Sequence, residues 1–281
     1  MNDLSESPEC APLSLTRKIE DFPIANRTLA GHQMEHGIAC HPHAWLDAAD
    51  LTELRSSGKS TLVDGEGQAL AWLGEVACAD DSLPACRSFL IRHPWDLLKA
   101  NEAAVAALTE NEILGEVHPL AVIEGKVRIG AGTRILPGVF IEGNVVIGAN
   151  CKIGPNCYLR GNTSIGDHCH IGQSVEIKNC LILSHTNVGH LSYVGDSVLG
   201  EKVNFGAGTT TSNLRHDGKN HFSTVDGQLI DTGRRKFGTI VGDHVHTGIN
   251  TSIYPGRKFW PHTSTRPGAV VQRDITLQSE I

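Results

Sequence analysis

The segment 189–196, with the sequence GHLSYVGD, contains the side chain best suited to move a proton in this chain. His190 has an imidazole, whose usual pKa near neutrality lets it accept a proton from an amine or a hydroxyl. It lies where a six-residue repeat slips, beside Tyr193 and shortly before a long polar insertion. A lone histidine is most often a solvated surface group, but this context favours a general base.

Two cations could bind an anionic group. Arg160 and Lys178 each directly follow an aliphatic residue of the repeat, at a position where glycine is usual. They are 18 residues apart, which is the length of one coil if each coil has three six-residue sides, so we expect them to stack on one edge of adjacent coils. Two stacked cations would form a phosphate clamp. The alternative is a pair of ordinary solvated basic residues.

Small residues and a basic insertion follow the histidine. Asn204 and Asn213 flank the sequence GAGTTT, whose small side chains would let a ligand approach the backbone, although such residues also fill coil corners. The insertion, residues 214–237, contains Lys219 and the triplet Arg-Arg-Lys at 234–236. A loop of this length favours a functional arm. The triplet could meet phosphates or could simply be solvated.

A regular repeat must position these residues. Stepping by six from Val117 meets an aliphatic residue at every position up to Leu183, and a small or β-branched residue follows most of them by four positions. After the insertion, the period returns at Val241. Short strands with a corner every six residues give coils with three flat sides, and stacked coils cover one another's apolar layers. The sequence therefore predicts a mainly β fold, a parallel β-helix over residues 113–275.

The cysteines have a structural role in this scheme. Cys151, Cys157 and Cys169 occupy the small interior position of the repeat, which predicts that they fill the core. No cysteine belongs to a CxxC pair, and the histidines that alternate in pairs lack further ligands to complete a tetrahedral set. We therefore expect reduced thiols and no metal site.

The first 93 residues have a weaker pattern. They suggest a small α/β region, with a helix after His43, two strands around the turn in STLVDGEGQALAWLG and another strand in RSFLIRH. A helix that begins near Pro94 has apolar residues at helical spacing and connects this region, over 94–112, to the repeats.

Composition excludes several function classes. A net charge of −7 offers no electrostatic footprint for nucleic acid. No apolar run approaches 18 residues, and the N-terminus has no apolar segment of a secretory signal, so we expect no membrane partner and a cytoplasmic protein.

The block GHLSYVGDSVLGEKVNFGAGTTTSN resembles the acetyltransferase domain of the bifunctional N-acetylglucosamine-1-phosphate uridyltransferase/glucosamine-1-phosphate acetyltransferases. The continuation through GRRKFGTIVGDHVHTGINTSIYPG is similar to archaeal-type sugar-1-phosphate nucleotidylyltransferases that carry the same β-helix. The resemblance spans roughly residues 94–275 and implies a left-handed β-helix, a homotrimer and acetyl-CoA as acyl donor. The Gly-rich nucleotide loop of those proteins is missing before residue 94, so we interpret residues 1–93 as a shortened relic of a nucleotidyltransferase domain or an unrelated cap.

The resemblance also implies roles for individual residues. His190 matches the general base that deprotonates the sugar amine. The expected acceptor-binding residues are Arg160, Lys178, Tyr193, Asn204 and Lys219. The expected acetyl-CoA contacts are Ala207, Asn213 and Leu214, the last of which stands where the bacterial family often has tyrosine.

These observations predict an acetyl-CoA-dependent N-acetyltransferase that acts on an amino-sugar 1-phosphate such as glucosamine 1-phosphate, a step toward UDP-sugar precursors of the cell envelope. Two alternatives remain open. The acceptor could be a nucleotide-linked amino sugar, or the chain could be a non-catalytic trimeric scaffold that binds sugar nucleotides.

Overall fold

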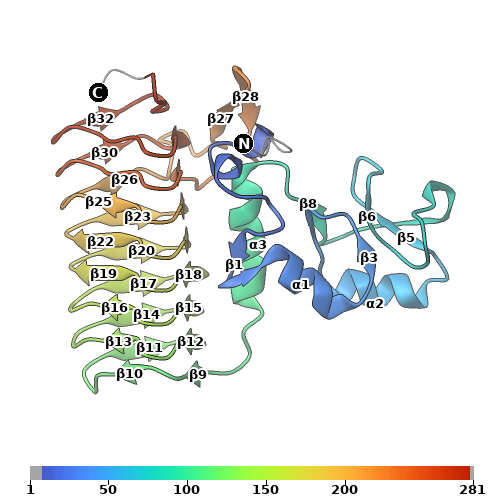
Figure 1. Ribbon diagram of the computed structural model, residues 1–281, viewed down its shortest axis with the longest axis horizontal. Coiled ribbons are helices and arrows are strands. Elements are labelled where there is room, and N and C mark those ends of the chain that lie inside the picture. Colours follow the sequence, from blue (N-terminus) through green and yellow to red (C-terminus); the bar gives the residue numbers. More distant parts are fainter. Residues whose placement is uncertain (1–7, 279–281) are drawn as a thin grey trace.

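A computed structural model describes residues 8–278. It contains a stack of short parallel strands and one long helix, α3 (Pro94–Ala106), alongside the stack (Figure 1). The first part of the N-terminal region lies next to α3 and contacts the stack, and residues 38–90 extend beyond the helix. The stack is the β-helix that the repeat predicts. Its strands form three sheets, here called faces 1, 2 and 3 in the order in which each coil passes through them.

The faces have these strands. Face 1 contains β10 (Glu116–Val117), β13 (Arg134–Ile135), β16 (Lys152–Ile153), β19 (His170–Gln173), β22 (Asn187–His190) and β25 (Asn204–Phe205). Face 2 contains β11 (Val122–Glu124), β14 (Phe140–Glu142), β17 (Tyr158–Arg160), β20 (Glu176–Lys178), β23 (Tyr193–Gly195), β26 (Thr210–Thr211), β30 (Ser252–Ile253) and β32 (Val270–Val271). Face 3 contains β9 (Glu112–Ile113), β12 (Val127–Ile129), β15 (Val145–Ile147), β18 (Thr163–Ile165), β21 (Leu181–Ile182), β24 (Val198–Leu199), β29 (Thr239–Val241) and β31 (Arg257–Phe259).

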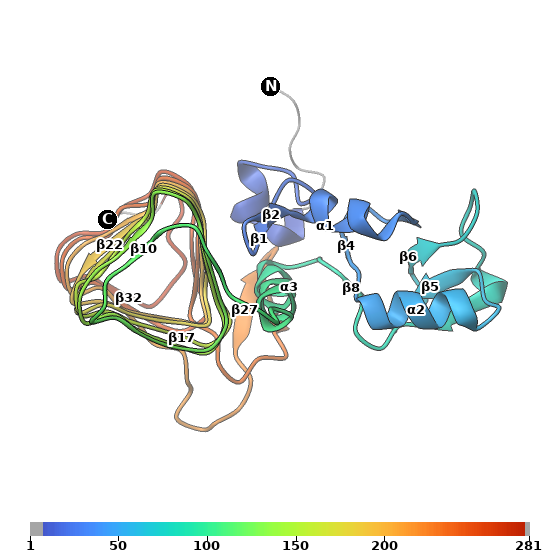
Figure 2. The same cartoon turned by 90° about the horizontal axis from the view of Figure 1, so that it is seen from below.

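The coil is left-handed. Figure 2 looks along the stack from its first coil, so the chain moves away from the viewer as it advances. In this view it passes counterclockwise from face 1, on the left, to face 2, below, and then to face 3, beside α3. Counterclockwise travel away from the viewer defines a left-handed helix, an exception to the usual right-handed crossover.

Aliphatic side chains fill the prism, one layer for each coil. Ile171, Ile177 and Val188 are fully buried in one continuous core, and the three cysteines of the repeat are buried there as predicted, together with Cys180. Burying side chains of this size contributes roughly 1.5–3 kcal/mol each, and every coil repeats the contribution.

The repeat slips at a different place from the one expected. After Ile177 the next interior aliphatic residue is Ile182, and after Val194 it is Leu199, so both steps are five residues long. Leu183, which the six-residue count placed in the prism, instead packs outside it, against the α3 side. His190 lies in a normal six-residue step, so the prediction that it marks the slip is wrong. The chain omits one residue at two successive corners between faces 2 and 3.

Helix α3 begins and ends on defined hydrogen bonds. Pro94 occupies its first turn, where a missing N–H is no loss, and the carboxylate of Asp96 accepts the backbone N–H groups of Arg92 (3.0 Å) and His93 (2.8 Å). At the other end, the amide of Asn144, from the β-helix, donates to the carbonyl of Val105 at 3.2 Å. The β-helix itself therefore caps the helix.

One amide joins α3 to both of its neighbours. Asn101 is fully buried, and its Oδ1 accepts from the backbone N–H of Ala25 (3.1 Å) and from the hydroxyl of Ser164 (2.6 Å). Its Nδ2 donates to the carbonyl of Asn162 at 3.3 Å. Apolar residues of α3, such as Leu97 and Leu98, complete a layer of packing over face 3.

The N-terminal region is built from short elements. It begins with two 3₁₀ turns (Pro8–Cys10 and Leu13–Leu15), the hairpin β1 (Pro23–Ile24) and β2 (Arg27–Thr28), and α1 (Leu29–His36). Beyond these lie β3 (Ala39–Cys40), β4 (Ala44–Trp45), α2 (Ala48–Ser56), β5 (Thr61–Val63), β6 (Ala69–Trp72), a 3₁₀ turn (Ala79–Asp81), β7 (Ser82–Pro84) and β8 (Phe89–Leu90). The predicted helix corresponds to α2, and the predicted strands correspond to β5, β6 and β8; α1 and the β1–β2 hairpin were not predicted.

The insertion leaves the stack without breaking it. Its two ends meet at an antiparallel bridge between Leu214 and Lys236, and the hairpin β27 (Phe222–Val225) and β28 (Gln228–Asp231) lies between them. The next coil continues in register, with Thr211 beside Ile253. None of the helices between residues 8 and 278 has the length and apolarity that crossing a membrane requires.

Candidate active site

The two expected cations lie on adjacent coils. Arg160 ends β17, Lys178 ends β20, and the two residues are register partners, as the 18-residue spacing predicts. Gly195 occupies the same position on the next coil. This column forms the edge of face 2 where the chain turns toward face 3.

Each cation already has a carboxylate partner. Arg160 forms an ion pair with Glu176 (Nη2–Oε1 2.6 Å), and Lys178 forms one with Asp196 (Nζ–Oδ2 2.8 Å). The first pair is about one-third exposed, whereas Asp196 is only 3% exposed. This edge of face 2 therefore has two adjacent ion pairs with no net charge. A phosphate that binds here would have to displace the carboxylates of Glu176 and Asp196 from the two cations, or bind the cations together with them.

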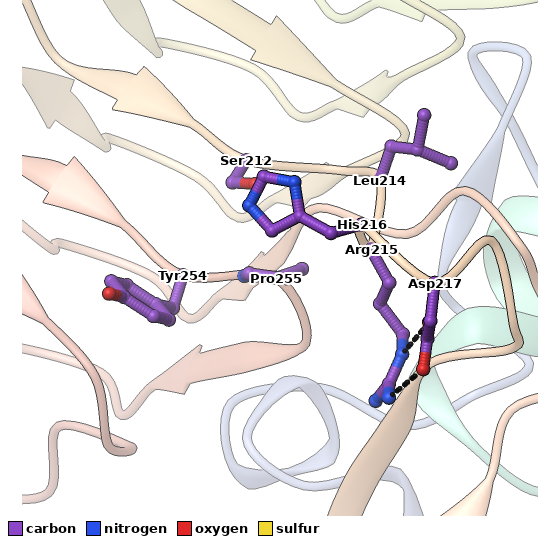
Figure 3. A pocket seen from close by; sticks show the side chains of 7 residues that line it. All are labelled: Ser212, Leu214, Arg215, His216, Asp217, Tyr254 and Pro255. Carbon is purple, nitrogen blue, oxygen red and sulfur yellow. Dashed lines mark hydrogen bonds and ion pairs between the residues drawn. The ribbon is translucent and has the colours of Figure 1, made fainter.

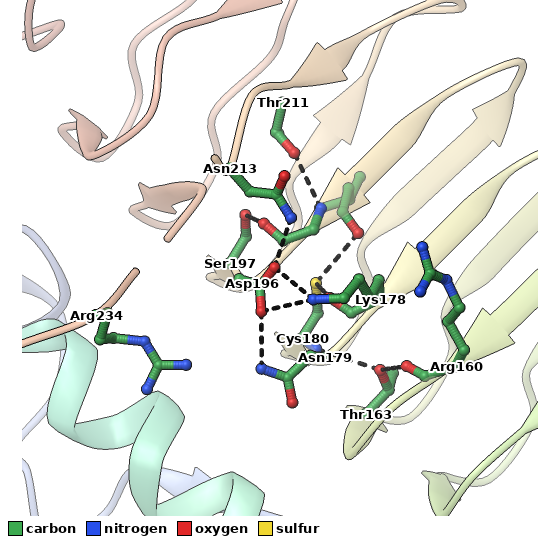
Figure 4. A network of polar contacts seen from close by, with 12 residues as sticks. Arg160, Thr163, Lys178, Asn179, Cys180, Asp196, Ser197, Thr211, Asn213 and Arg234 are labelled. Carbon is green, nitrogen blue, oxygen red and sulfur yellow. Dashed lines mark hydrogen bonds and ion pairs between the residues drawn. The ribbon is translucent and has the colours of Figure 1, made fainter. Parts of the chain in front are cut away.

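Asp196 collects donors from three side chains. Lys178 donates to both of its oxygens (2.9 and 2.8 Å), and the amides of Asn179 (3.1 Å) and Asn213 (2.5 Å) donate as well. Figure 4 shows the ammonium directed at the carboxylate, with the two amides on either side. A carboxylate this buried needs such donors, because desolvation would otherwise penalise its charge.

Tyr193 reaches this group because Gly195 has no side chain. The phenol oxygen accepts from Asn213 Nδ2 at 2.9 Å, and the ring crosses over Gly195 on the way. A Cβ at residue 195 would lie 2.5 Å from that oxygen. Burial, then the charges of Asp196 and Glu176, raise the pKa of Tyr193, so its hydroxyl keeps its proton at neutral pH.

The insertion holds Asn213 from the other side. The imidazole of His221, itself buried, lies 3.1 Å from the backbone oxygen of Asn213, and the backbone N–H of Phe237 donates to the same oxygen at 3.0 Å. Burial lowers the pKa of His221, which favours the neutral ring. Asn213 is thus fixed through its backbone by the insertion and through its side chain by Asp196.

His190 lies at the other edge of face 2. It ends β22 on face 1, just before the corner that leads to β23, and its side chain is exposed. Within residues 8–278 its imidazole has no hydrogen-bond or ion-pair partner, so both ring nitrogens can meet a ligand. Its carbonyl accepts from Ser192 Oγ (2.7 Å) and from the backbone N–H of Gly208 (3.1 Å), which fixes the strand end.

Asn204 and Ala207 belong to the same side as His190. Asn204 begins β25 on face 1, one coil beyond Asn187, and is exposed. Ala207 is at the following corner, where its carbonyl accepts from the backbone N–H of Asn250 at 2.8 Å. The structure therefore separates the predicted residues into two groups, one along each edge of face 2.

Leu214 lines a cavity at the base of the insertion. The cavity has a volume of about 430 Å³, and its walls are formed by Ser212, Leu214, Arg215, His216, Asp217, Tyr254 and Pro255 (Figure 3). Arg215 and Asp217 form an ion pair on one side, at 2.7 Å. Lys219 follows this loop and is exposed, and its backbone N–H donates to Asp217 at 3.2 Å.

The alternating histidine pairs of the β-helix do not lie together on one strand face. His168 is at a corner, stacked on His185 with ring centroids 4.8 Å apart, whereas His170 is on face 1. His244 stacks in the same way on His262, at 4.6 Å. In the described part of the chain, no group of three or more His, Cys, Asp or Glu residues is arranged to hold a metal ion.

Sequence reasoning missed the carboxylates. Glu176 and Asp196 sit among the predicted residues, yet only the cations were identified. The five-residue steps from Ile177 to Ile182 and from Val194 to Leu199 could have revealed Asp196, because they mark the two unusual corners.

Comparison with known proteins supports the resemblance. Residues 141–265 match the family model of the GMPPB C-terminal domain. A bifunctional sugar-1-phosphate nucleotidylyltransferase/acetyltransferase of Sulfurisphaera tokodaii is 46% identical over 185 residues, which cover 66% of this chain and 46% of that protein. The bifunctional protein GlmU of Methanococcus maripaludis strain C7 is 48% identical over 189 residues, which cover 67% of this chain and 46% of that protein.

A solved structure was also matched. The UDP-N-acetylglucosamine acyltransferase of Campylobacter jejuni is 16% identical, with coverage of 56% of this chain and 69% of that chain, and a TM-score of 0.32.

The class follows from the fold and the repeat: this is a hexapeptide-repeat left-handed β-helix with a polar site along one face. More particularly, about two-thirds of the chain is similar to the bifunctional sugar-1-phosphate nucleotidylyltransferase/acetyltransferases, as the block around His190 indicated. It spans about half the length of the curated relatives that it matches.

Proposed function

We propose that the chain is an acetyl-CoA-dependent N-acetyltransferase whose acceptor is an amino-sugar 1-phosphate. The observation that carries the proposal is the exposed imidazole of His190 at one edge of face 2, with the cluster of Lys178, Asp196 and Asn213 at the other. The first group suits proton transfer, and the second offers charged and amide groups that suit a polar sugar.

In this proposal acetyl-CoA supplies the activated acyl group. His190 accepts the proton that the acceptor amine loses as its nitrogen forms the bond to the acyl carbon and the carbon–sulfur bond breaks. Tyr193 and Asn213 orient the acceptor, and Arg160 and Lys178 meet its anionic group in exchange for part of their contact with Glu176 and Asp196. The backbone N–H of Ala207 stabilises the developing oxyanion, since the N–H groups of Gly206 and Gly208 already donate to Thr247 and His190.

The proposal includes a homotrimer. The two groups of candidate residues lie on opposite edges of one face, and exposed apolar side chains such as Leu191 and Val122 accompany that face. Packing neighbouring chains along it would bring the His190 edge of one protomer to the cluster of the next. Size-exclusion chromatography with light scattering tests this, and a monomer that still turns over would contradict it.

A nucleotide-linked amino sugar is the second candidate acceptor. Ser212 and Tyr254 continue the column of Lys178 and Gly195 along the stack, since Thr211 pairs with Ile253. The ring of Tyr254 is half exposed in the cavity next to Leu214, where a nucleobase could stack on it.

The test is an assay of thiol release with acetyl-CoA and either glucosamine 1-phosphate or UDP-glucosamine. We expect release that requires an acceptor and that falls by roughly 10²–10⁴-fold in His190→Ala, as for the loss of a general base. His185→Ala, which removes an exposed corner histidine, is the matched control and should retain activity. Equal slow release from wild type and His190→Ala would contradict the mechanism and favour the scaffold.

A further inference from the structure

The two shortened corners carry the polar residues at the centre of the site. Asn179 and Asp196 each follow a face-2 strand, and both adopt the left-handed conformation, with φ of 53° and 49°. Asn and Asp tolerate this conformation better than most residues. Because each corner lacks one residue, both side chains are held close to the strand ends and to each other: Asn179 Nδ2 lies 3.1 Å from Asp196 Oδ1.

Asn179 extends this contact to helix α3. The same Nδ2 donates to Glu102 Oε1 at 2.5 Å, so one amide group bridges two carboxylates. Glu102 lies on α3, the helix between the N-terminal region and the β-helix. The contact therefore joins the site to an element that the sequence assigned only as a connector.

The insertion closes the chain of contacts. Both terminal nitrogens of Arg234 bond to the carboxylate of Glu102, the Nη1–Oε2 distance being 3.2 Å. The guanidinium is 16% exposed and the carboxylate 26% exposed, so solvent screens this pair only partly. The network thus has a cation at each end, Arg234 on Glu102 and Lys178 on Asp196, and the amide of Asn179 bridges the two carboxylates in the middle.

We propose that Glu102 and Arg234 are positioning residues of the acceptor site. They hold Asn179, which holds Asp196, and Asp196 sets the positions of the Lys178 ammonium and the Asn213 amide. The role of Lys178 in binding an acceptor rests on the function proposed above, whereas the mechanical link does not. The insertion and α3 thereby determine acceptor affinity without touching the acceptor.

Breaking the outer pair should loosen the inner one. Without Arg234, the Glu102 carboxylate loses its charged partner and can rotate toward solvent. Asn179 then loses one of its two acceptors, and Asp196 is held by fewer constraints. Lys178 spends more time away from Asp196, and its ammonium becomes more accessible to reagents.

Chemical labelling tests the link independently of catalysis. The full chain is exposed to a brief pulse of acetic anhydride, and acylation of Lys178 is measured by peptide mass spectrometry relative to the exposed Lys126. We expect labelling of Lys178 to rise at least about threefold in Glu102→Gln and in Arg234→Gln, as for a broken link in a coupled network. Arg235→Gln is the matched control, because Arg235 donates to Gly218 in the same loop and lies outside the network.

Acceptor kinetics provide the second readout. Each variant should raise the KM for the amino sugar while kcat changes little, and the double variant should resemble either single one, because the residues act in series. Arg234→Lys, which keeps a charge but loses the two-pronged contact, should give an intermediate result and covers the case in which the glutamine variant fails to fold. Labelling and KM values equal to those of Arg235→Gln would overturn the proposal. A wild-type protein that turns over no acceptor would overturn the proposed function instead, and the labelling result would still decide the link.

Discussion

The β-helix and the distal part of the N-terminal region, residues 38–90, both use strands of two to four residues but stabilise them differently. In the β-helix each strand pairs with the equivalent strand of the next coil, and a single core runs through the stack. The distal part has a small core of its own around Leu51, Leu54 and Leu62. It also depends on single contacts, such as the buried carboxylate of Asp50, which accepts the backbone N–H groups of Arg87 and Ser88.

The difference concerns how a disturbance spreads. A contact that repeats in every coil packs against equivalent contacts in the two adjacent coils, so its removal also destabilises those coils. Removal of a contact that occurs once destabilises only its own surroundings. We therefore expect the two regions to unfold as separate units, with α3 between them, and substitutions in one region should leave the other largely unchanged.

Removing one core side chain from each region should have the largest effect and tests their independence. Ile171→Ala and Leu54→Ala each truncate a fully buried residue, so each should cost about 2–5 kcal/mol. Ile171→Ala should accelerate hydrogen exchange in the coils of β16, β19 and β22, as followed by mass spectrometry. Leu54→Ala should accelerate it only within residues 38–90. If Leu54→Ala destabilised the coils to the same extent, the two regions would be one cooperative unit.

Substitution of two glycines by alanine distinguishes an effect on the candidate site from an effect on the stability of the β-helix. In Gly195→Ala the new methyl group would lie 2.5 Å from the phenol oxygen of Tyr193 and 2.7 Å from the amide nitrogen of Asn213. Both are ends of side chains that can move, so we expect a loss of only about 1–2 kcal/mol in the free energy of unfolding but a raised acceptor KM. Gly189→Ala, which meets nothing within 4 Å, is the stability control. Identical KM values for Gly195→Ala and wild type would show that the position of Tyr193 is not needed.

The smallest effect is the part of the pH dependence of stability that comes from His32 in the N-terminal region. Burial lowers the pKa of His32 below its usual value of 6.5, and its ring packs against Trp45 at 5.1 Å. The other groups that face it are the carbonyl of Ile24, Arg27, Glu35 and His36. Because the unfolded chain binds the proton more readily, stability is complete above pH 6.5 and decreases as the pH falls toward the lower native pKa.

Thermal unfolding followed by tryptophan fluorescence between pH 7.5 and 5 would measure this dependence. In His32→Gln the loss of unfolding free energy between pH 7.5 and 5 should be smaller than in the wild type by less than about 1 kcal/mol. The glutamine keeps a hydrogen-bond donor for the carbonyl of Ile24 but does not titrate. An unchanged pH profile in His32→Gln would assign the sensitivity to another group.

The same difference explains what the sequence could predict. The period identified the three-sided stack, the interior cysteines and the register of Arg160 with Lys178, because each is a consequence of spacing alone. Leu183 was misplaced because a fixed step of six cannot anticipate a corner that omits a residue. The pairing of Lys178 with Asp196 depends on that corner, so it was also missed.

The contact between Glu102 and Arg234 could not be predicted from the sequence at all. These residues are 132 positions apart, and only the packing of α3 and the insertion against face 3 brings them together. Spacing carries no information about such a pair. In the N-terminal region the hairpin β1–β2 was missed for a similar reason: it is fixed by Asn101 and by the bond from Asn26 to the carbonyl of Ile165 at 2.7 Å, not by a pattern of its own.

The bridge between Leu214 and Lys236 makes the insertion an exchangeable part. The chain leaves the stack and returns to it through adjacent residues, and the coils on either side pair as though nothing lay between them. A different arm can therefore be grafted at this corner, provided that it keeps the apolar residues, such as Val225 and Phe237, that pack with Trp95 of α3. Since the arm contributes both a cavity wall and Arg234, a single graft would change the cavity and the contact with Glu102 together.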